Sequence, residues 1–183
     1  MKNIAFIGKI CSGKTTITNN LIIKLNENNF NYKKASFADG VYEIAYNLFD
    51  MKNKNRNLLQ SIGMKMREID ENIWIKSTIK KVNHFNKNDT YIIIDDCRFQ
   101  NELDNLIKND FILIKLNISN ELQLNRLKNT YPDTWNEQNL NHISENNLNN
   151  LSENIFQIII NIDDFKNLND IIDNIYNKIL YFI

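Results

Sequence analysis

Hydrophobic residues fall into two patterns that alternate along the chain. Short, uninterrupted apolar runs are typical of parallel strands that are covered on both faces. Longer stretches in which apolar residues recur every three or four positions are typical of amphipathic helices. The runs predict strands at about 3–7, 32–37, 91–94, 111–116 and 156–162. The stretches predict helices at about 15–28, 41–49, 57–67, 71–85, 100–108, 120–128, 144–151 and from 168 onward.

The order of these elements predicts the fold class. Strands alternate with helices without a linker or an internal repeat, which indicates an α/β protein with a five-stranded parallel sheet and helices on both faces. The 183 residues suggest a single domain over 1–183. Two parts depart from simple alternation. One is a helical insertion at about 40–88, and the other is a weakly periodic stretch at about 129–142, which fits a flap.

Composition and charge exclude several classes of protein. The 22 basic and 22 acidic residues balance, which argues against a broad surface for polymeric nucleic acid. No apolar run approaches the length of a membrane span, and the first residues lead straight into a strand, so we expect neither a membrane anchor nor a signal peptide. The two cysteines, Cys11 and Cys97, suggest neither a disulfide framework nor a metal site. We therefore expect a cytoplasmic protein of a reducing compartment.

A bias in residue usage makes the arginines informative. Asn fills roughly one position in five, and Lys far outnumbers Arg, as in the products of AT-rich genomes. The planar guanidinium binds phosphate through two parallel hydrogen bonds and stays charged, so each Arg in such a chain is a candidate phosphate ligand. The arginines are Arg56, Arg67, Arg98 and Arg126.

The strongest motif is a glycine loop between the first strand and the first helix. Residues 8–15 read G-K-I-C-S-G-K-T and fit G-x-x-x-x-G-K-[ST], the phosphate-binding loop (P-loop). The glycines let successive N–H groups point at a phosphate, and the helix N-terminus adds partial positive charge. Lys14 would reach the β- and γ-phosphates, and the Thr15 hydroxyl would bind Mg²⁺. The expected triphosphate-binding residues are Gly8, Cys11, Ser12, Gly13, Lys14, Thr15 and Thr16.

Acidic and aromatic residues give further candidates. The strand at 91–94 ends in Asp95 and Asp96, where a carboxylate orders Mg²⁺ or its waters; only one of the two need face the site. Asp39 follows the second strand and is either a helix cap or a ligand at the carboxyl end of the sheet. Trp74 lies on a predicted helix and is either a core residue or a platform on which a base stacks.

The rest of the chain distinguishes between two classes of P-loop protein. A switch GTPase would carry N-K-x-D after a later strand, but residues 115–119 read K-L-N-I-S. A kinase needs a second, anionic substrate, cations for the transferring group and closure that excludes water. The insertion, the scattered arginines and the flap supply these parts, so the pattern favours a kinase.

Several segments outside the P-loop carry a family resemblance. They are S-F-A-D at 36–39, L-L-Q-S-I-G at 58–63, R-E-I-D-E-N-I-W at 67–74, D-C-R-F-Q-N-E at 96–102 and H-I-S-E at 142–145. In this order they resemble the deoxynucleoside monophosphate kinases of tailed phages, which belong to the adenylate-kinase-like P-loop kinases.

This resemblance implies a reaction. The family transfers the γ-phosphate of ATP to a deoxynucleoside monophosphate (dNMP) with Mg²⁺, giving the diphosphate for DNA precursor synthesis. It implies that Thr15 and Asp96 serve Mg²⁺, and that a homodimer forms. The implied catalytic residues are Lys14, Arg98 and Arg126. The implied acceptor-binding residues are Asp39, Arg67, Trp74 and Arg98.

The chain also departs from the family pattern, and two alternatives stay open. Gly40 and Gln100 stand where the family favours proline, and the predicted flap contains no Arg. His142, Ser144 and Glu145 match the motif, with helix capping as the plain interpretation. The alternatives are a P-loop kinase of another small acceptor, such as dephospho-coenzyme A, and a nucleotide-binding module without catalysis.

Overall fold

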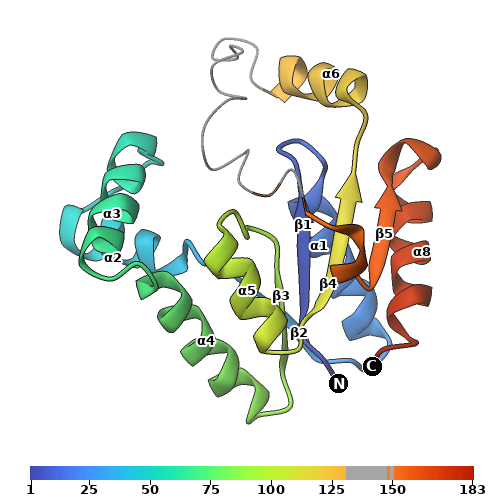
Figure 1. The fold of residues 1–183 in the computed structure, drawn as a ribbon, viewed down its shortest axis with the longest axis horizontal. Coiled ribbons are helices and arrows are strands. Elements are labelled where there is room, and N and C mark those ends of the chain that lie inside the picture. The colour runs from blue at the N-terminus through green and yellow to red at the C-terminus, as the bar shows by residue number, and fades with distance from the viewer. Residues whose placement is uncertain (131–147, 149–150) are drawn as a thin grey trace.

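The sheet has the predicted parallel architecture. The structure is a computed structural model and describes residues 1–130, 148 and 151–183. Its five parallel strands lie in the order β2-β3-β1-β4-β5 (Figure 1). The strands are β1 (Ile4–Gly8), β2 (Tyr32–Ala35), β3 (Tyr91–Ile94), β4 (Ile112–Asn117) and β5 (Ile158–Asn161).

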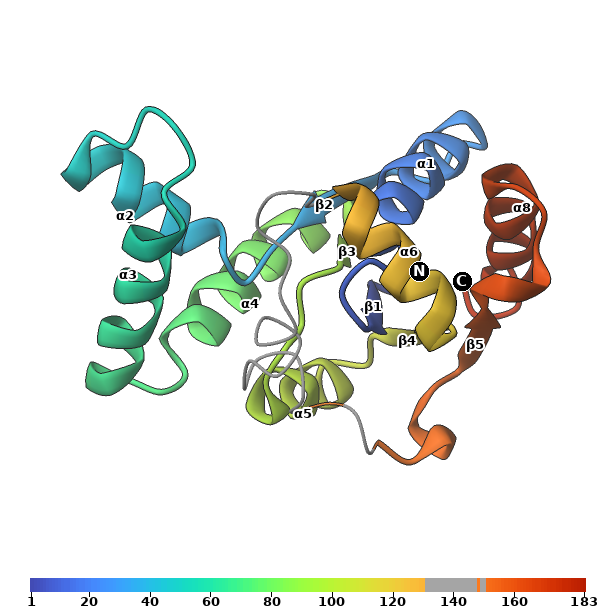
Figure 2. The same ribbon diagram turned by 90° about the horizontal axis from the view of Figure 1, so that it is seen from above.

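Helices cover both faces of the sheet, as predicted. Helices α1 (Lys14–Glu27) and α8 (Leu168–Ile179) bury their apolar residues on one face, and α4 (Ile73–Asn86) and α5 (Gln100–Lys108) bury theirs on the other (Figure 2). Along β3, Ile93 belongs to the first core, whereas Ile92 and Ile94 belong to the second. All three are fully buried, and burying such a side chain contributes about 1.5–3 kcal/mol. This continuous burial explains why the strand is apolar at every position.

The insertion between β2 and β3 forms a small helical unit beside the sheet (Figure 1). It consists of α2 (Asp39–Phe49) and α3 (Arg56–Ile69), which pack on each other and on the start of α4. Its own apolar cluster contains Val41, Ala45, Met51, Ile62 and Trp74. The unit thus has a separate core and is joined to the sheet through α4.

The remaining described elements follow β4 or stand on either side of β5 along the chain. They are α6 (Asn120–Thr130) and two short 3-10 helices, η2 (Glu153–Ile155) and η3 (Ile162–Asp164). The flap prediction (129–142) and the helix prediction (144–151) fall largely outside the described residues. Within the described part of the chain, no helix has the length and apolarity to cross a membrane.

One difference from the predicted element bounds arises where a main-chain turn ends β2. Helix α5 has the predicted bounds, but β2 ends at Ala35 rather than at residue 37. The Ser36 carbonyl accepts a hydrogen bond from Asp39 N (3.2 Å), so the chain turns there and α2 begins two residues early.

Candidate functional site

A large cavity lies at the carboxyl ends of the parallel strands. Its volume is about 1210 Å³, above the usual range for a small-ligand pocket. Ligands bind at this edge in open α/β sheets. The cavity is lined by 8–16 of the glycine loop and α1, 95–98 after β3, 115–119 after β4, parts of α6, and Ile162, Asp163 and 165–168 after β5.

Close packing and backbone conformation fix the P-loop. A Cβ at Gly8 would lie 2.7 Å from the carbonyl oxygen of Leu116, so β4 leaves no room for a side chain there. Gly13 has φ +91°, and Cys11 has φ 61° although it is not glycine. A left-handed residue other than glycine costs about 1–2 kcal/mol, which the packing around the loop must offset. The loop shape therefore depends on glycine at both motif positions.

The Lys14 side chain folds back on this loop and bonds to its main chain. Its Nζ donates to the carbonyl oxygens of Gly8 (2.6 Å) and Lys9 (2.8 Å). Because α1 begins at Lys14, the N–H groups of its first turn are available to an anion, and the helix dipole favours negative charge. The lysine charge and the helix N-terminus thus meet at one end of the cavity.

Helix α6 lies across the outer rim of the P-loop. The Arg126 guanidinium donates from Nη1 to the carbonyl oxygen of Cys11 (3.2 Å). Gln123, which is 8% exposed, donates from Nε2 to the carbonyl oxygen of Ile10 (3.0 Å). The structure therefore places the predicted Arg126 at the loop and adds Gln123, which no sequence motif indicated because its partner lies far away in the chain.

The start of α6 is tied to the segment after β5. The Ser119 hydroxyl accepts from Leu122 N (3.3 Å) in the first turn of α6, and it donates to Asp163. Hydrogen bonds from Ser119 lower the pKa of the Asp163 carboxyl, and the Arg126 charge lowers it further. The segment after β5 is therefore fastened to the start of the helix that carries Arg126.

The two acidic residues after β3 have different partners. Asp95 is 5% exposed and pairs with Lys34 on β2 (2.7 Å). Asp96 accepts hydrogen bonds from the Ser36 hydroxyl and from the N–H groups of Phe37 and Ala38 (3.0 Å each). Burial raises the pKa of the Asp96 carboxyl, although these hydrogen bonds lower it. Asp96 thus also fastens the loop that leads into the helical insertion.

The residues around the P-loop fit a magnesium ion. Thr15, Asp95 and Asp96 all line the cavity and offer a hydroxyl and carboxylates, which are the oxygen ligands that Mg²⁺ takes. Among the described residues, no cluster of three or more His, Cys, Asp or Glu could hold a metal. A Mg²⁺ ion that shares its ligands with substrate phosphates and water needs no such cluster.

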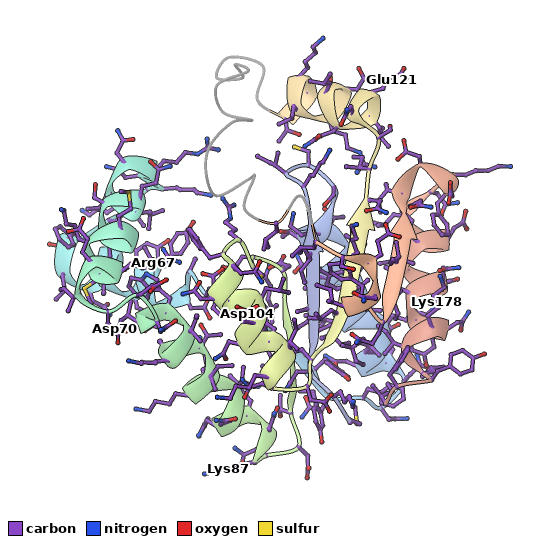
Figure 3. All side chains as sticks on the ribbon, viewed as in Figure 1. Arg67, Asp70, Lys87, Asp104, Glu121 and Lys178 are labelled. Carbon is purple, nitrogen blue, oxygen red and sulfur yellow. The ribbon has the colours of Figure 1, made fainter. Side chains whose placement is uncertain are left out.

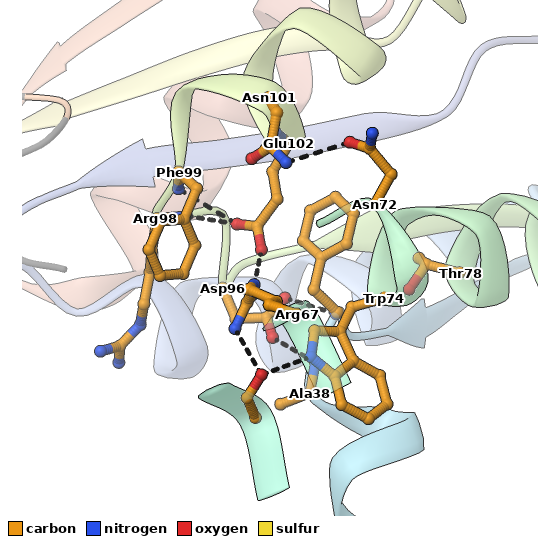
Figure 4. Close-up of polar contacts among 12 residues, drawn as sticks. Ala38, Arg67, Asn72, Trp74, Thr78, Asp96, Arg98, Phe99, Asn101 and Glu102 are labelled. Atoms are coloured by element: carbon orange, nitrogen blue, oxygen red, sulfur yellow. Dashed lines mark hydrogen bonds and ion pairs between the residues drawn. The ribbon is translucent and has the colours of Figure 1, made fainter. Parts of the chain in front are cut away.

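The Arg67 guanidinium and the main-chain N–H of Arg98 both donate to one carboxylate, that of Glu102. Arg67 Nη2 lies 2.9 Å from Glu102 Oε1, and its guanidinium stacks 4.3 Å from the centre of the Phe99 ring (Figure 4). The other oxygen, Oε2, accepts from Arg98 N (2.8 Å) and Phe99 N (3.2 Å). The side chain of Arg98 lines the cavity, whereas Arg67 lies on the insertion, well apart from Glu121 of α6 (Figure 3). Glu102 is part of the D-C-R-F-Q-N-E segment at 96–102, but no role was predicted for it.

Trp74 corrects one prediction. It is 3% exposed in the core of the insertion, and its Nε1 donates to the carbonyl oxygen of Gly63 (3.1 Å). A Cβ at Gly40 would lie 2.9 Å from its Cζ3 atom, so the ring covers the start of α2. The indole is buried among core residues and does not offer a face on which a base stacks.

The cavity brings together some of the predicted site residues and leaves others outside. Lys14, Thr15, Asp96, Arg98 and Arg126 line it, with the rest of the predicted P-loop set. Asp39, Arg67 and Trp74 are not part of its lining. Asp39 instead pairs with Lys81 (2.7 Å) and accepts from Ser36 N (3.3 Å). His142, Ser144 and Glu145 lie outside the described residues.

The strand order, the glycine loop and the cavity define an α/β protein with a P-loop kinase-like fold, and solved structures share it. A sugar kinase from Janibacter sp. HTCC2649 matches with a TM-score of 0.60 and 14% identity, over 98% of this chain and 94% of that one. The structure of APE1195 matches with a TM-score of 0.59 and 14% identity, over 96% and 94%. A protein from Chloroflexus aurantiacus, provisionally assigned as a kinase, matches with a TM-score of 0.55 and 13% identity, over 98% and 97%.

These likenesses show the fold alone, because the identities are low. No protein-family model matches the chain, and no curated protein matches it in sequence.

Proposed function

We propose that this protein is a kinase that transfers the γ-phosphate of ATP to a deoxynucleoside 5′-monophosphate. The observation that carries the proposal is the cavity, in which Lys14, Arg98 and Arg126 surround the P-loop at the carboxyl edge of the sheet. Three cations that enter one cavity from different elements suit a reaction in which negative charge spreads over the oxygens of the transferring group.

The triphosphate would lie along the P-loop. The N–H groups at the start of α1 and the Lys14 ammonium would bind its β- and γ-phosphates. Arg126, which lies over the Cys11 carbonyl group, would turn toward the transferring phosphoryl group when the loop is filled. Thr15 and Asp96 would hold Mg²⁺, which would neutralise phosphate charge and orient the phosphates.

The acceptor would enter between the P-loop and the helical insertion. Arg98 faces the cavity, and Arg67 shares its Glu102 partner with the backbone of Arg98. We assign the acceptor phosphate to these two arginines, because a guanidinium binds phosphate through parallel hydrogen bonds. Asp39, at the start of α2, would contact the nucleoside after the insertion moves toward the sheet, as in other kinases that close on substrate.

The test is release of ADP from ATP and Mg²⁺ in the presence of each of the four common dNMPs and the matching ribonucleotides. Turnover with at least one deoxynucleotide is the expected result, and the comparison with ribonucleotides gives sugar selectivity. Folded protein that binds ATP but turns over none of these acceptors would overturn the proposal.

Other acceptors serve as the comparison in the same assay. Dephospho-coenzyme A tests a different phosphorylated acceptor on the same fold. A hexose tests the acceptor class that the name of the Janibacter protein indicates. If one of these supports turnover and the nucleotides do not, the kinase chemistry stands and the acceptor assignment is wrong. A nucleotide-binding module without catalysis would release no ADP with any of them.

A further inference from the structure

We propose that Glu102 is a positioning residue, which orients Arg67 so that its guanidinium can bind the phosphate of an anionic acceptor. This inference rests on the proposed function and names a residue to which the family resemblance gives no role. Glu102 itself does not reach the acceptor, because its side chain is only 3% exposed, whereas that of Arg67 is 26% exposed. It would act through the arginine.

The two oxygens of the Glu102 carboxylate serve different partners. Oε2 accepts the N–H groups of Arg98 and Phe99 at the start of α5, at 2.8 and 3.2 Å. Oε1 faces the other way and accepts Arg67 Nη2 at 2.9 Å (Figure 4). One carboxylate thus fixes the loop that carries Arg98 and the side chain of Arg67. A substitution that affects only one oxygen can separate the two tasks.

Three contacts define the place of the Arg67 guanidinium. Glu102 holds Nη2, the Gly63 carbonyl oxygen lies 3.4 Å from Nη1, and Phe99 stacks on one face. The contact with Gly63 is long, so Glu102 supplies the strongest of the three. A guanidinium carries five N–H donors, and those not directed at Glu102 and Gly63 remain to form a fork on a phosphate.

The ion pair also joins two parts of the molecule. Arg67 belongs to α3 of the insertion, and Glu102 belongs to α5, which packs on the sheet. Without the carboxylate, the long arginine side chain would gain rotamer freedom, and phosphate binding would have to remove it again. The predicted cost of losing Glu102 therefore falls on acceptor binding and not on the ATP side.

Glu102→Gln tests this cleanly. An amide oxygen in the place of Oε2 still accepts both backbone N–H groups, whereas the amide nitrogen then faces the donors of Arg67. We expect the acceptor KM to rise about 10- to 100-fold, the range that a charge-assisted hydrogen bond supplies. The kcat and the KM for ATP should change by less than about threefold. Glu68→Gln is the matched control, because Glu68 forms an exposed ion pair with Lys65 on the same helix α3.

Two further variants identify the path of the effect. Arg67→Ala should raise the acceptor KM to a similar degree, and the double variant Arg67→Ala with Glu102→Gln should be no worse than Arg67→Ala alone, because both substitutions remove one interaction. Arg67→Lys leaves the Glu102 bonds at α5 in place but lacks the fork, so it should also raise the acceptor KM. Arg67→Lys therefore still tests the proposal if Glu102→Gln does not fold.

Calorimetry supplies a readout that does not depend on turnover. Glu102→Gln should weaken binding of a dNMP and leave binding of the same deoxynucleoside without phosphate unchanged. If wild-type protein binds the dNMP in this Glu102-dependent way but releases no ADP, the positioning inference stands and the proposed reaction fails. If wild-type protein turns over the dNMP and Glu102→Gln leaves its KM within twofold, the reaction stands and the positioning inference is overturned. Effects of Arg67→Ala and Glu102→Gln that multiply in the double variant would also overturn it.

Discussion

The P-loop side of the molecule and the side that carries the helical insertion are held in different ways. On the P-loop side, Lys14 contacts carbonyl groups six and five residues before it, within one strand-loop-helix unit. On the insertion side, Arg67 meets a carboxylate 35 residues away, and Ser36 meets one 60 residues away. Contacts within one segment thus hold Lys14, whereas contacts between distant segments hold Arg67 and Ser36.

This difference indicates that substitutions can affect the P-loop and the insertion separately. The P-loop is held between β1, β4 and α6, and its form follows from glycine positions and main-chain hydrogen bonds. The insertion has its own core and meets the sheet through α4, the Asp96 anchor and the Arg67–Glu102 pair. Substitutions on one side should therefore change the kinetic constants of one substrate and spare those of the other.

The largest effect is expected for Lys14→Ala. It removes the ammonium that would face the β- and γ-phosphates, and kcat should fall about a thousandfold or more, as when a preorganised electrostatic donor is lost. Lys9→Ala is the control, because Lys9 is in the same loop but is exposed, and its ammonium donates to Asn120 Oδ1 (3.1 Å). Steady-state kinetics measure both. Full activity in Lys14→Ala would contradict the assigned donor site.

Arg126→Ala should have the second largest effect. Loss of a cation near the transferring group lowers kcat about 100-fold, while Gln123 still holds α6 to the Ile10 carbonyl oxygen. The dissociation constant for ATP and the acceptor KM should therefore change little. Lys128→Ala, on the same helix, controls for the loss of positive charge. An unchanged kcat in Arg126→Ala would contradict the catalytic role, and the hydrogen bond to the Cys11 carbonyl oxygen would be the remaining role of this arginine.

The fold was largely predictable because its signals are local. The strand at Tyr91–Ile94 is apolar throughout, since both of its faces are buried, and α5 has a clear apolar stripe. The P-loop was predictable for the same reason, because its motif is contiguous. The bounds of β2 were not, because they depend on a turn that the Ser36 carbonyl group makes with Asp39 N.

The acceptor side was only partly predictable because its contacts are long-range. The sequence indicated Arg67 but not its partner, because Glu102 lies 35 residues away along the chain. Gln123, on the P-loop side, was missed for the same reason, since its partner carbonyl group lies 113 residues before it. Trp74 was wrongly predicted as an acceptor contact, because an aromatic residue on an amphipathic helix has the same pattern whether it packs in a core or binds a base. Only the packing on Gly40 distinguishes the two.

Gly40→Ala tests whether the insertion can be loosened alone. The added methyl group would lie 2.9 Å from Cζ3 of the buried Trp74, and overpacking of this kind costs about 1–3 kcal/mol. Thermal unfolding should show a lower Tm, and the acceptor KM should rise a few-fold while ATP affinity is unchanged. Gly63→Ala is the control for Tm alone, because its methyl group would meet Arg67 Nη1 at an ordinary 3.7 Å. Loss of ATP affinity in Gly40→Ala would show that the two sides are coupled.

The last prediction is a pH dependence of acceptor binding. Burial raises the pKa of the Glu102 carboxyl and the Asp96 charge adds to this, although the Arg98 and Phe99 N–H groups and the Arg67 charge lower it. Above this raised pKa the carboxylate is charged and pairs with Arg67. As the pH falls through it, the carboxyl takes up a proton and the pair weakens, so the acceptor KM should rise by up to about tenfold. The KM for ATP should not follow this titration.

Lowering the pH should weaken acceptor binding but increase the contribution of Glu102 to the free energy of unfolding of the protein. This difference separates a positioning role of Glu102 from a structural one. Because the pKa of Glu102 is higher in the folded protein than in the unfolded chain, the folded state takes up the proton first. The contribution of this group to the free energy of unfolding therefore grows as the pH falls through the folded-state pKa, and it is constant below the unfolded-state pKa.

The ratio of the wild-type acceptor KM to that of Glu102→Gln cancels the titration of the acceptor phosphate. That ratio should rise toward low pH, in the same range where urea unfolding shows wild-type protein gaining stability relative to the variant. A ratio that is flat, or that rises with increasing pH, would mean that the charge of Glu102 does not set the position of Arg67.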